Sequence, residues 1–382
     1  ECNIRFMYTD TVGNEVSAPS GTEVGVGLLA GTTANNNSLA NYGKYSGITM
    51  TNCVVEGPTD VGGLIGASGY GSRTTNKNDK TWIVNRNDTS STDNRYSPVK
   101  LYNCSYNGMT VSGGQNVGGF VGKLNGGSQG GVWTTADADI AQNSTIVSDG
   151  SRVGSVFGVT GDAVFVNVDP ATKQPTAESG KATITGVTLS VPATAGKDGG
   201  VGGLIGKVEN NLYVRNLTVT GGKNVKVFGA DNATTFMNVG GIAGNITDGG
   251  EFTFDTCEVS NVSLQAREVS GGISGRISGS PTVTCNNVTV NDVTFGSSYA
   301  GGINGSIGGS PTFSITNTKI ANNVFENPSN NWEGANNQKS RSGGLCGDGK
   351  GVFRLSNVLI DSNNFRGKNG QGIFFGDAKD KS

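Results

Sequence analysis

Val201-Gly-Gly-Leu-Ile-Gly206 is one copy of a six-residue motif that returns along the whole chain. Val61-Gly-Gly-Leu-Ile-Gly66 is identical to it, and looser versions lie at residues 25–31 and 370–376. Close variants begin at Val117, Val153, Val239, Ser270, Ala300 and Ser342. A unit repeated in this way stacks on its neighbours, so the sequence predicts one elongated domain over residues 1–382 rather than several globular ones.

The composition excludes several classes of protein. The 382 residues include 63 Gly but only 9 Pro, without a Gly-X-Y period, so the chain is not collagen. The net charge is −2 without a basic stripe, which argues against nucleic acid and anionic membranes as partners. No apolar run approaches the ~18 residues of a membrane-spanning helix. His is absent, which removes the commonest general base and metal ligand.

A second pattern, apolar-x-Asn-apolar-x-apolar, lies between the glycine clusters. Its period-two alternation changes phase at the Asn, which is typical of two short strands joined by a tight corner. Asn suits such a corner because it tolerates a left-handed backbone. In stacked coils we expect Asn52 beside Asn103, and Asn287 beside Asn317 and then Asn357. Copies of the pattern include Met50-Thr-Asn-Cys-Val-Val55, Leu101-Tyr-Asn-Cys-Ser-Tyr106 and Cys285-Asn-Asn-Val-Thr-Val290.

The glycine motif is then expected to be the third strand of each coil. Its glycines allow close backbone approach, its Leu or Ile points into the core, and the next residue points outward. The prediction is an all-β fold: a single right-handed parallel β-helix, or β-solenoid, of about ten three-strand coils. The coils are irregular, with long insertions, over residues 1–200 and regular over residues 201–382.

The glycine motif, followed by Gly/Asn turns and Val-x-Asn-Val-Thr-Val strands, resembles the GLUG-type repeats of bacterial surface proteins. The resemblance covers essentially the whole chain. It implies a parallel β-helix in a cell-surface, adhesin-like protein. Val153-Gly-Ser-Val-Phe-Gly158 departs from the pattern because it lacks the second glycine.

Two sets of large apolar residues lie where a β-helix would expose them. One is the outward position of the glycine motif, and we expect an interface stripe there, covered by the insertions or by a neighbouring chain, while the later coils leave this face wet. The other set, the tryptophans of the insertions, provides either platforms for glycan or partner contact or anchors that pin each loop onto the rod. The stripe is Ile65, Val121, Phe157 and Ile205, and the tryptophans are Trp82, Trp133 and Trp332.

Cysteines and Asn-x-Ser/Thr sequons provide candidate modification sites. Cys53 and Cys104 occupy the same place in consecutive copies of the Asn pattern, so they form a disulfide or lie as two free, buried thiols. Cys257 and Cys285 are out of register and are expected to be unbonded core residues. Sequons with an outward Asn would carry glycan in a host that glycosylates them: Asn36, Asn87, Asn143, Asn232, Asn245, Asn261 and Asn304.

No catalytic, metal or cofactor site is evident. Asp137 with Asp139, and Asp162 with Asp169, lie in loops, and no two carboxylates stack at one outward strand position as a polysaccharide-cleaving β-helix would need. The leading interpretation is a non-enzymatic protein, extracellular or on the cell surface, with a structural or adhesive role. It would be a surface-fibre or filament subunit or an adhesin stalk, associating with itself or with other surface proteins or glycans. The alternatives are a carbohydrate-binding module that uses the loop tryptophans, and a polysaccharide-degrading β-helix enzyme.

Overall fold

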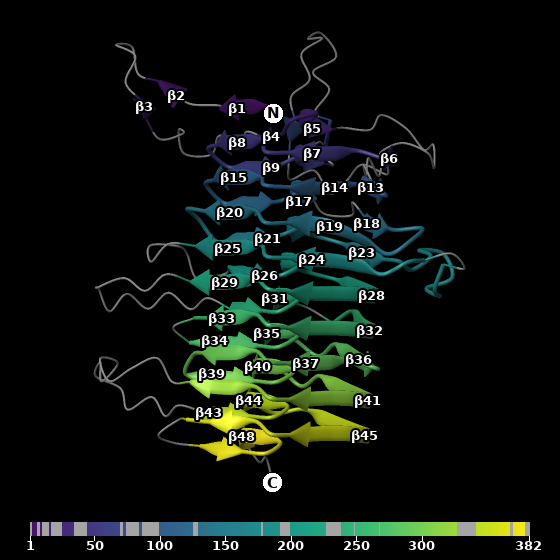
Figure 1. Cartoon of the computed structure of the whole chain (residues 1–382), viewed down its shortest axis with the longest axis vertical. Helices are drawn as coiled ribbons and strands as arrows, with labels where there is room; N and C mark the ends of the chain where they lie inside the picture. The colour runs from purple at the N-terminus through teal and green to yellow at the C-terminus, as the bar shows by residue number, and fades with distance from the viewer. Residues whose placement is uncertain are drawn as a thin grey trace.

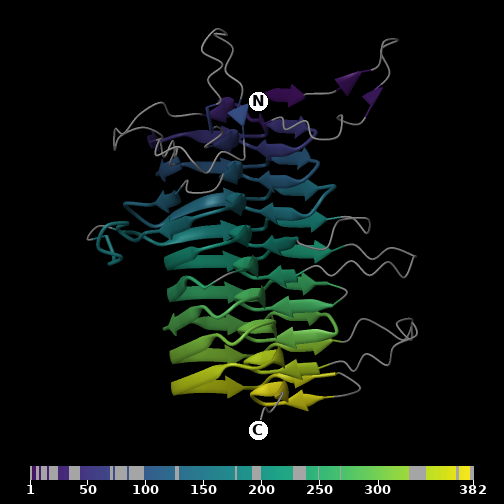
Figure 2. The ribbon, with the colours of Figure 1, turned by 180° about the vertical axis from the view of Figure 1, so that it is seen from behind.

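The computed structural model shows a chain built of short strands joined by turns, with no helix among the described residues (Figure 1). The strands of successive turns of the chain lie side by side along the whole stack, as the view from behind also shows (Figure 2). The prediction of an all-β solenoid of parallel strands is confirmed. The described residues are 2–5, 8–9, 15–16, 25–33, 44–68, 72–73, 84–85, 99–124, 129–176, 179–191, 199–226, 238–247, 249–266, 268–326, 341–366 and 370–378.

Four large parallel sheets run along the stack, and we number them I to IV in the order in which one turn of the chain visits them. Sheet I comprises β6 (Lys44–Ser46), β7 (Thr49–Thr51), β13 (Val99–Tyr102), β14 (Ser105–Asn107), β18 (Gly130–Trp133), β19 (Ala138–Gln142), β23 (Ala163–Val166), β24 (Ala182–Thr185), β28 (Asn211–Thr220), β32 (Glu251–Ser260), β36 (Thr282–Asn286), β37 (Thr289–Asn291), β41 (Thr312–Ala321) and β45 (Val352–Asp361). Sheet II comprises β1 (Asn3–Arg5), β8 (Val54–Gly57), β15 (Thr110–Gly113), β20 (Thr145–Ser148), β25 (Thr188–Val191), β29 (Lys223–Lys226), β33 (Ser263–Gln265), β38 (Thr294–Gly296), β42 (Val324–Glu326) and β46 (Asn364–Phe365).

The other two large sheets flank the glycine motif. Sheet III comprises β4 (Gly25–Val26), β9 (Asp60–Gly62), β16 (Asn116–Gly118), β21 (Arg152–Gly154), β26 (Gly200–Gly202), β30 (Asn238–Gly240), β34 (Val269–Gly271), β39 (Tyr299–Gly301), β43 (Arg341–Gly343) and β47 (Gln371–Gly372). Sheet IV comprises β5 (Ala30–Thr33), β10 (Ile65–Ser68), β17 (Val121–Leu124), β22 (Phe157–Thr160), β27 (Ile205–Val208), β31 (Ala243–Ile246), β35 (Ser274–Ile277), β40 (Asn304–Ile307), β44 (Cys346–Gly349) and β48 (Phe375–Ala378). Two small antiparallel pairs, β2 (Tyr8–Thr9) with β3 (Glu15–Val16) and β11 (Ser72–Arg73) with β12 (Val84–Asn85), stand apart from the stack.

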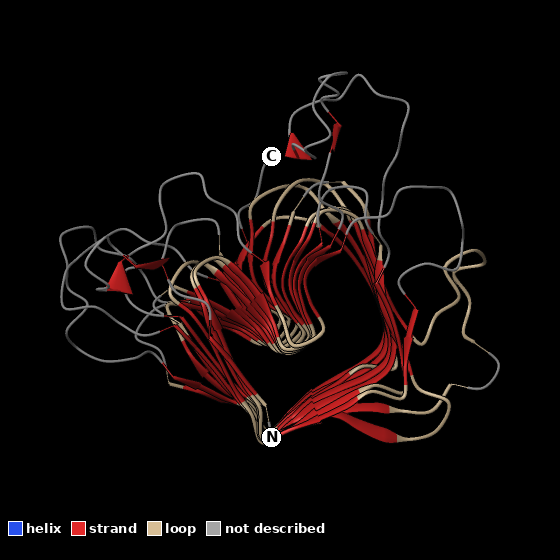
Figure 3. Cartoon of the chain, turned by 90° about the horizontal axis from the view of Figure 1, so that it is seen from above, coloured by secondary structure: helices blue, strands red, loops and turns tan. Residues whose placement is uncertain are grey.

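The glycine motif is a sharp turn between two sheets rather than one strand. Viewed along the stack, part of the outline folds inward to a tight turn (Figure 3). At this fold-back sheets III and IV approach so closely that a Cβ on Gly206 would lie 2.6 Å from the backbone nitrogen of Val153. A Cβ on Gly203 would lie 2.0 Å from the carbonyl oxygen of Gly241 in the next turn. Each turn of the chain therefore contributes to four sheets, and the expected three-strand coil is corrected.

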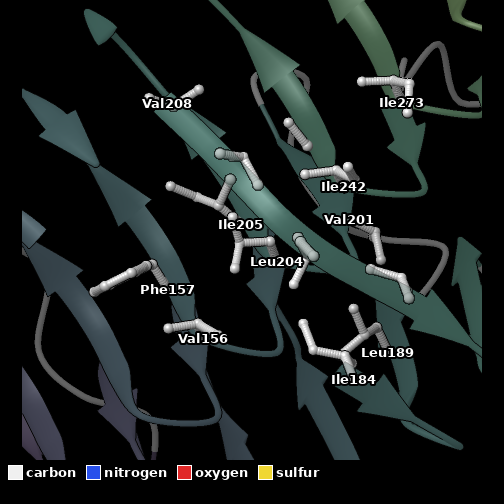
Figure 4. Close-up of a cluster of buried hydrophobic side chains, with 14 of the residues drawn as sticks. Val156, Phe157, Ile184, Leu189, Val201, Leu204, Ile205, Val208, Ile242 and Ile273 are labelled. Carbon is white, nitrogen blue, oxygen red and sulfur yellow. The ribbon is translucent and has the colours of Figure 1, made fainter. Parts of the chain in front are cut away.

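The fold-back also changes which residues face the core. Leu204 and Ile205 are both fully buried, and both lie among the apolar side chains of the interior (Figure 4). Gly206, not Ile205, faces sheet III, because the turn interrupts the period-two alternation counted along a single strand. The expected outward stripe is therefore wrong: Ile65, Val121, Phe157 and Ile205 are all 0% exposed and belong to the main hydrophobic core. Their later counterparts, Ala243, Ser274, Asn304 and Cys346, are buried as well, so no wet face replaces the stripe.

The Asn pattern occurs at two different corners of each turn. Left-handed residues lie five positions apart, one within sheet I and one between sheets I and II, as in the pairs Asn103/Gly108, Asn216/Gly221, Asn287/Asp292, Asn317/Asn322 and Asn357/Ser362. Because Tyr102 pairs with Ser46 and Asn107 with Thr51, Asn103 lies beside Gly47 and Asn52 beside Gly108. The expected stacking of Asn52 on Asn103 is therefore wrong.

The later column of Asn residues is confirmed, and its amide hydrogen bonds are confirmed in part. Asn286 pairs with Thr316 and Thr316 with Ser356, which places Asn287, Asn317 and Asn357 in one column. The amide Nδ2 of Asn357 donates to Oδ1 of Asn317 at 2.8 Å. The Nδ2 of Asn317 donates to Oδ1 of Asn286 at 3.5 Å and not to Asn287, so the amide hydrogen bonds of this column join Asn317 and Asn357 while the backbones form the corner.

Candidate functional site

Trp133 anchors a loop to the outer face of sheet I. It is 6% exposed, stacks on Tyr102 with ring centroids 4.9 Å apart, and donates from Nε1 to the carbonyl oxygen of Val168 at 3.0 Å. Phe165 stacks on Tyr213 in the same cluster. Of the two roles expected for the tryptophans, the structure supports anchoring for Trp133, because its ring is covered. Trp82 and Trp332 lie outside the described residues.

The loop after β23 is also held by charged groups. Asp169 accepts backbone hydrogen bonds from Ala171 and Thr172, and the bonds from Thr172 hold the pKa of its carboxyl below the ordinary value. Glu251 accepts from the Tyr213 hydroxyl at 2.6 Å and from Lys173 Nζ at 3.0 Å, and both interactions lower the pKa of Glu251. Asp169 therefore orders the loop itself, and Glu251 of β32 fastens the loop to the rod through Lys173.

The cysteines are free thiols. Because Thr110 pairs with Val54 and Ser105 with Thr49, Cys53 lies beside Met109 and Cys104 beside Ile48. The two thiols thus belong to different corners, and of the two expected states, a disulfide or two free buried thiols, the structure has the free thiols. Cys257 and Cys285 are buried and unbonded, as predicted, and Cys285 pairs with Phe254. Burial raises the pKa of Cys285 to about 12.

The sequons divide between corners and core. Asn143 and Asn261 are exposed, left-handed corner residues. Asn245 and Asn304 are buried, so their expected outward position is wrong. Asn304 occupies the core column of Ile205, and its Nδ2 donates to Ser274 Oγ at 2.7 Å. Asn36, Asn87 and Asn232 lie outside the described residues.

The C-terminal end of the described stack is apolar. Leu355 is 41% exposed although its register partner Ile315 is fully buried. Val352 and Leu359 are 53% and 51% exposed at columns where β41 carries Thr312 and Lys319. Ile373 and Phe374 add further exposed apolar surface. We call this set the terminal apolar face: Val352, Leu355, Leu359, Ile373 and Phe374.

A second candidate site is a buried polar cluster. It lies where sheets III and IV fold back, near β9 and β16. Asn116 Nδ2 donates to Asp60 Oδ1 at 2.5 Å, and Lys123 Nζ lies 3.8 Å from Asp60 Oδ2. Arg152 donates from a terminal guanidinium nitrogen to Asn116 Oδ1 at 3.1 Å. Asp60, Asn116 and Lys123 are 2%, 2% and 8% exposed. Asp60 and Asn116 are register partners on adjacent strands of sheet III, and the fold-back adds Lys123 from sheet IV; sequence reasoning missed the cluster because it treated the glycine motif as one strand without a fold-back.

Comparisons with protein-family models, curated proteins and solved structures find no match to this chain. Within the described ranges, no group of three or more His, Cys, Asp or Glu residues is placed to hold a metal ion. The same part of the chain contains no helix that is both long and apolar enough to cross a membrane.

Proposed function

We propose that this chain is a non-enzymatic extracellular or cell-surface protein with a structural or adhesive role. It is a right-handed β-solenoid of about ten turns, of the kind that GLUG-type repeats are expected to form. It acts as a surface-fibre or filament subunit, or as the stalk of an adhesin, and its partners are further copies or other surface proteins and glycans.

The terminal apolar face is the observation that carries this proposal. Among the described residues, β45 to β48 pair with strands of the preceding turn on one edge, and no described strand lies on the other. On the outward side of β45, Val352 and Leu359 are apolar where the preceding strand has Thr312 and Lys319, and the polar Arg354 and Ser356 lie between them. Exposed apolar surface next to open strand edges is typical of an interaction site. The rod behind it provides rigid length, because every turn is hydrogen-bonded to the next.

The carbohydrate-binding alternative is weakened by one observation. Trp133 is buried under its own loop, so glycan binding would depend on Trp82 or Trp332. Loss of binding to an immobilised polysaccharide on Trp82→Ala, with the fold intact, would favour that alternative. Shortened polysaccharide chains after incubation would establish the enzyme instead.

Self-association through the terminal apolar face is testable with a variant that copies the preceding turn. The double variant Val352→Thr, Leu359→Lys gives β45 the residue types that β41 has at the same two columns, Thr312 and Lys319. The strand is therefore expected to keep its fold. Sedimentation velocity over a concentration series should show association of the wild-type chain, weakened about tenfold (about 1.4 kcal/mol) in the variant. Thr49→Lys adds the same charge on exposed sheet I surface far from this end and should change nothing. A wild-type chain that stays monomeric, or a variant that associates equally well, refutes the proposal.

A further inference from the structure

The polar cluster at the fold-back places an amine and a carboxamide on the two oxygens of one buried carboxylate. Asp60 begins β9 and Asn116 begins β16, and the two residues are in register. The Asn116 amide contacts Asp60 Oδ1 at 2.5 Å, while Lys123 Nζ lies 3.8 Å from Asp60 Oδ2. The reacting groups of an amide exchange, a primary amine and a carboxamide, thus meet at one acid, which is 2% exposed.

Asn116 and Lys123 occupy the two sides of the fold-back in their own turn, and both contact Asp60. They begin and nearly end the β16–β17 unit, seven positions apart. The same two positions in the β43–β44 unit hold Arg341 and Asp348, whose side chains form a direct ion pair. Side chains at this pair of positions therefore reach each other across the closely packed sheets III and IV.

We propose that Lys123 and Asn116 form an intramolecular isopeptide bond, with Asp60 as proton carrier and Arg152 as the group that polarises the Asn116 carbonyl. The ammonium of Lys123 first gives a proton to the Asp60 carboxylate, whose Oδ2 lies 3.8 Å from Nζ, which leaves a neutral amine and a neutral acid. The free amine then attacks Cγ of Asn116. Negative charge develops on Oδ1, where Arg152 already donates a hydrogen bond at 3.1 Å.

The remaining steps restore the carboxylate. Asp60 returns its proton to Nδ2 of Asn116, to which it is already hydrogen-bonded, and the Cγ–Nδ2 bond breaks. The Nζ–Cγ amide remains, and the leaving ammonia takes up the last proton of Nζ. The sum is one ammonium and one carboxamide giving one secondary amide and one ammonium ion, without oxidant or cofactor.

Other turns lack this combination at the corresponding columns. Lys207 shares the column of Lys123, but the facing position is Gly200 and its amine pairs with Glu209 at 3.0 Å. In the β30–β31 unit these two positions hold Asn238 and Asn245, two amides without an amine. Among the described turns, the β16–β17 unit is thus the one that sets Lys opposite Asn beside a carboxylate on the neighbouring strand.

The mass of the purified, denatured wild-type chain tests the bond without any variant. We expect a mass about 17 Da below that of the sequence, the mass of one ammonia. Trypsin should not cleave after Lys123, so residues 101–152 appear as one peptide carrying the same deficit. The full sequence mass overturns the proposal. A loss of one water, about 18 Da, would instead place the bond on Asp60 and overturn the role of Asn116. A deficit of one ammonia with trypsin still cleaving after Lys123 would indicate a cyclised Asn, and this result also overturns the proposal.

Variants then assign the roles. Lys123→Arg and Asn116→Ala should each give the full sequence mass, because each removes one partner of the bond. Asp60→Asn should also give the full mass, although Lys123 and Asn116 are both still present, because it removes the proton carrier. Lys207→Arg and Asn238→Ala change the same columns in other turns and should keep the deficit. Circular dichroism of each variant verifies the fold. A deficit that persists in Lys123→Arg contradicts the assignment.

Discussion

The fold-back at Gly241 allows the steric role of the second glycine of the motif to be tested. A Cβ at this position would lie 2.0 Å from the carbonyl oxygen of Gly272 and 2.7 Å from Cγ1 of Val259. The amide of Gly241 donates to the carbonyl oxygen of Gly271 at 3.0 Å. Gly241→Ala therefore forces two neighbouring turns apart by about 1 Å in a stack whose strands are spaced by about 4.8 Å.

The cost has two sources. Relieving an overpacked contact typically costs about 1–3 kcal/mol, and a stretched backbone hydrogen bond about 0.5–1.5 kcal/mol more. We therefore expect Gly241→Ala to lower the free energy of unfolding by about 2–4 kcal/mol. Because a solenoid is stabilised by contacts between neighbouring turns, the effect should concentrate in the turns on either side of β31.

Hydrogen exchange followed by mass spectrometry, together with urea denaturation, measures both the size and the place of the effect. Gly249→Ala is the matched control, since a Cβ there meets nothing within 4 Å. It should be neutral or stabilising by up to about 1 kcal/mol through the unfolded chain. If the urea midpoint of Gly241→Ala equals that of Gly249→Ala, and protection near β31 is unchanged, the close approach does not explain the glycine.

Two further predictions concern a corner and a buried thiol. Asn317 has φ +49°, so Asn317→Ala should lower the free energy of unfolding by about 1–2 kcal/mol and Asn317→Gly by much less. Both variants lose the hydrogen bond from Asn357, so the difference between them reports on the backbone alone. Equal shifts in the melting temperature of the two variants would contradict the backbone explanation. Burial raises the pKa of Cys285 from 9.0 to about 12, so its stabilising contribution is complete below pH 9 and is lost as the pH rises towards 12, because the unfolded thiol ionises first. Compared with Cys285→Ala, the wild type should lose up to about 1.4 kcal/mol more per pH unit in that window in urea denaturation, and parallel pH profiles would refute this.

The repeat predicted the solenoid but not its cross-section. A stacked unit follows directly from a glycine motif that returns along the chain, whereas a strand and a sharp turn are both rich in glycine. The distinction depends on which atoms the missing Cβ would meet, and at Gly203 these belong to the next turn. In the first turn, Leu28 occupies the column of the second glycine of the motif. Its amide donates to the carbonyl of Gly63, the second glycine of the next turn, whereas the amide of Gly241 donates to Gly271, the first glycine of the next turn. The hydrogen bond is thus shifted by one residue where this column carries a side chain.

The Asn corners illustrate a second limit of pattern reading. Asn52 and Asn103 share the same local pattern, yet they occupy corners that differ by five positions in the turn. One signal would have separated them: Gly47 precedes Asn52 by five residues, and Gly108 follows Asn103 by five. Matching such pairs, rather than single Asn residues, places Cys53 and Cys104 in different columns and removes the disulfide between them.

The same reasoning explains where functional residues can be sought in this fold. Every column of a solenoid is filled again in each turn, so neighbouring turns indicate what the fold alone requires at that position. Lys123 lies between Ala67 and Val159 in its column, and Leu359 follows Lys319 in another. Leu359 departs from the polar residue before it in its column, whereas Lys123 shares its column with Lys207 and differs from it by having Asn116 at the facing position. Because register defines the columns, these departures become visible only after the fold-back and both corners are assigned, which is why both candidate features escaped the sequence.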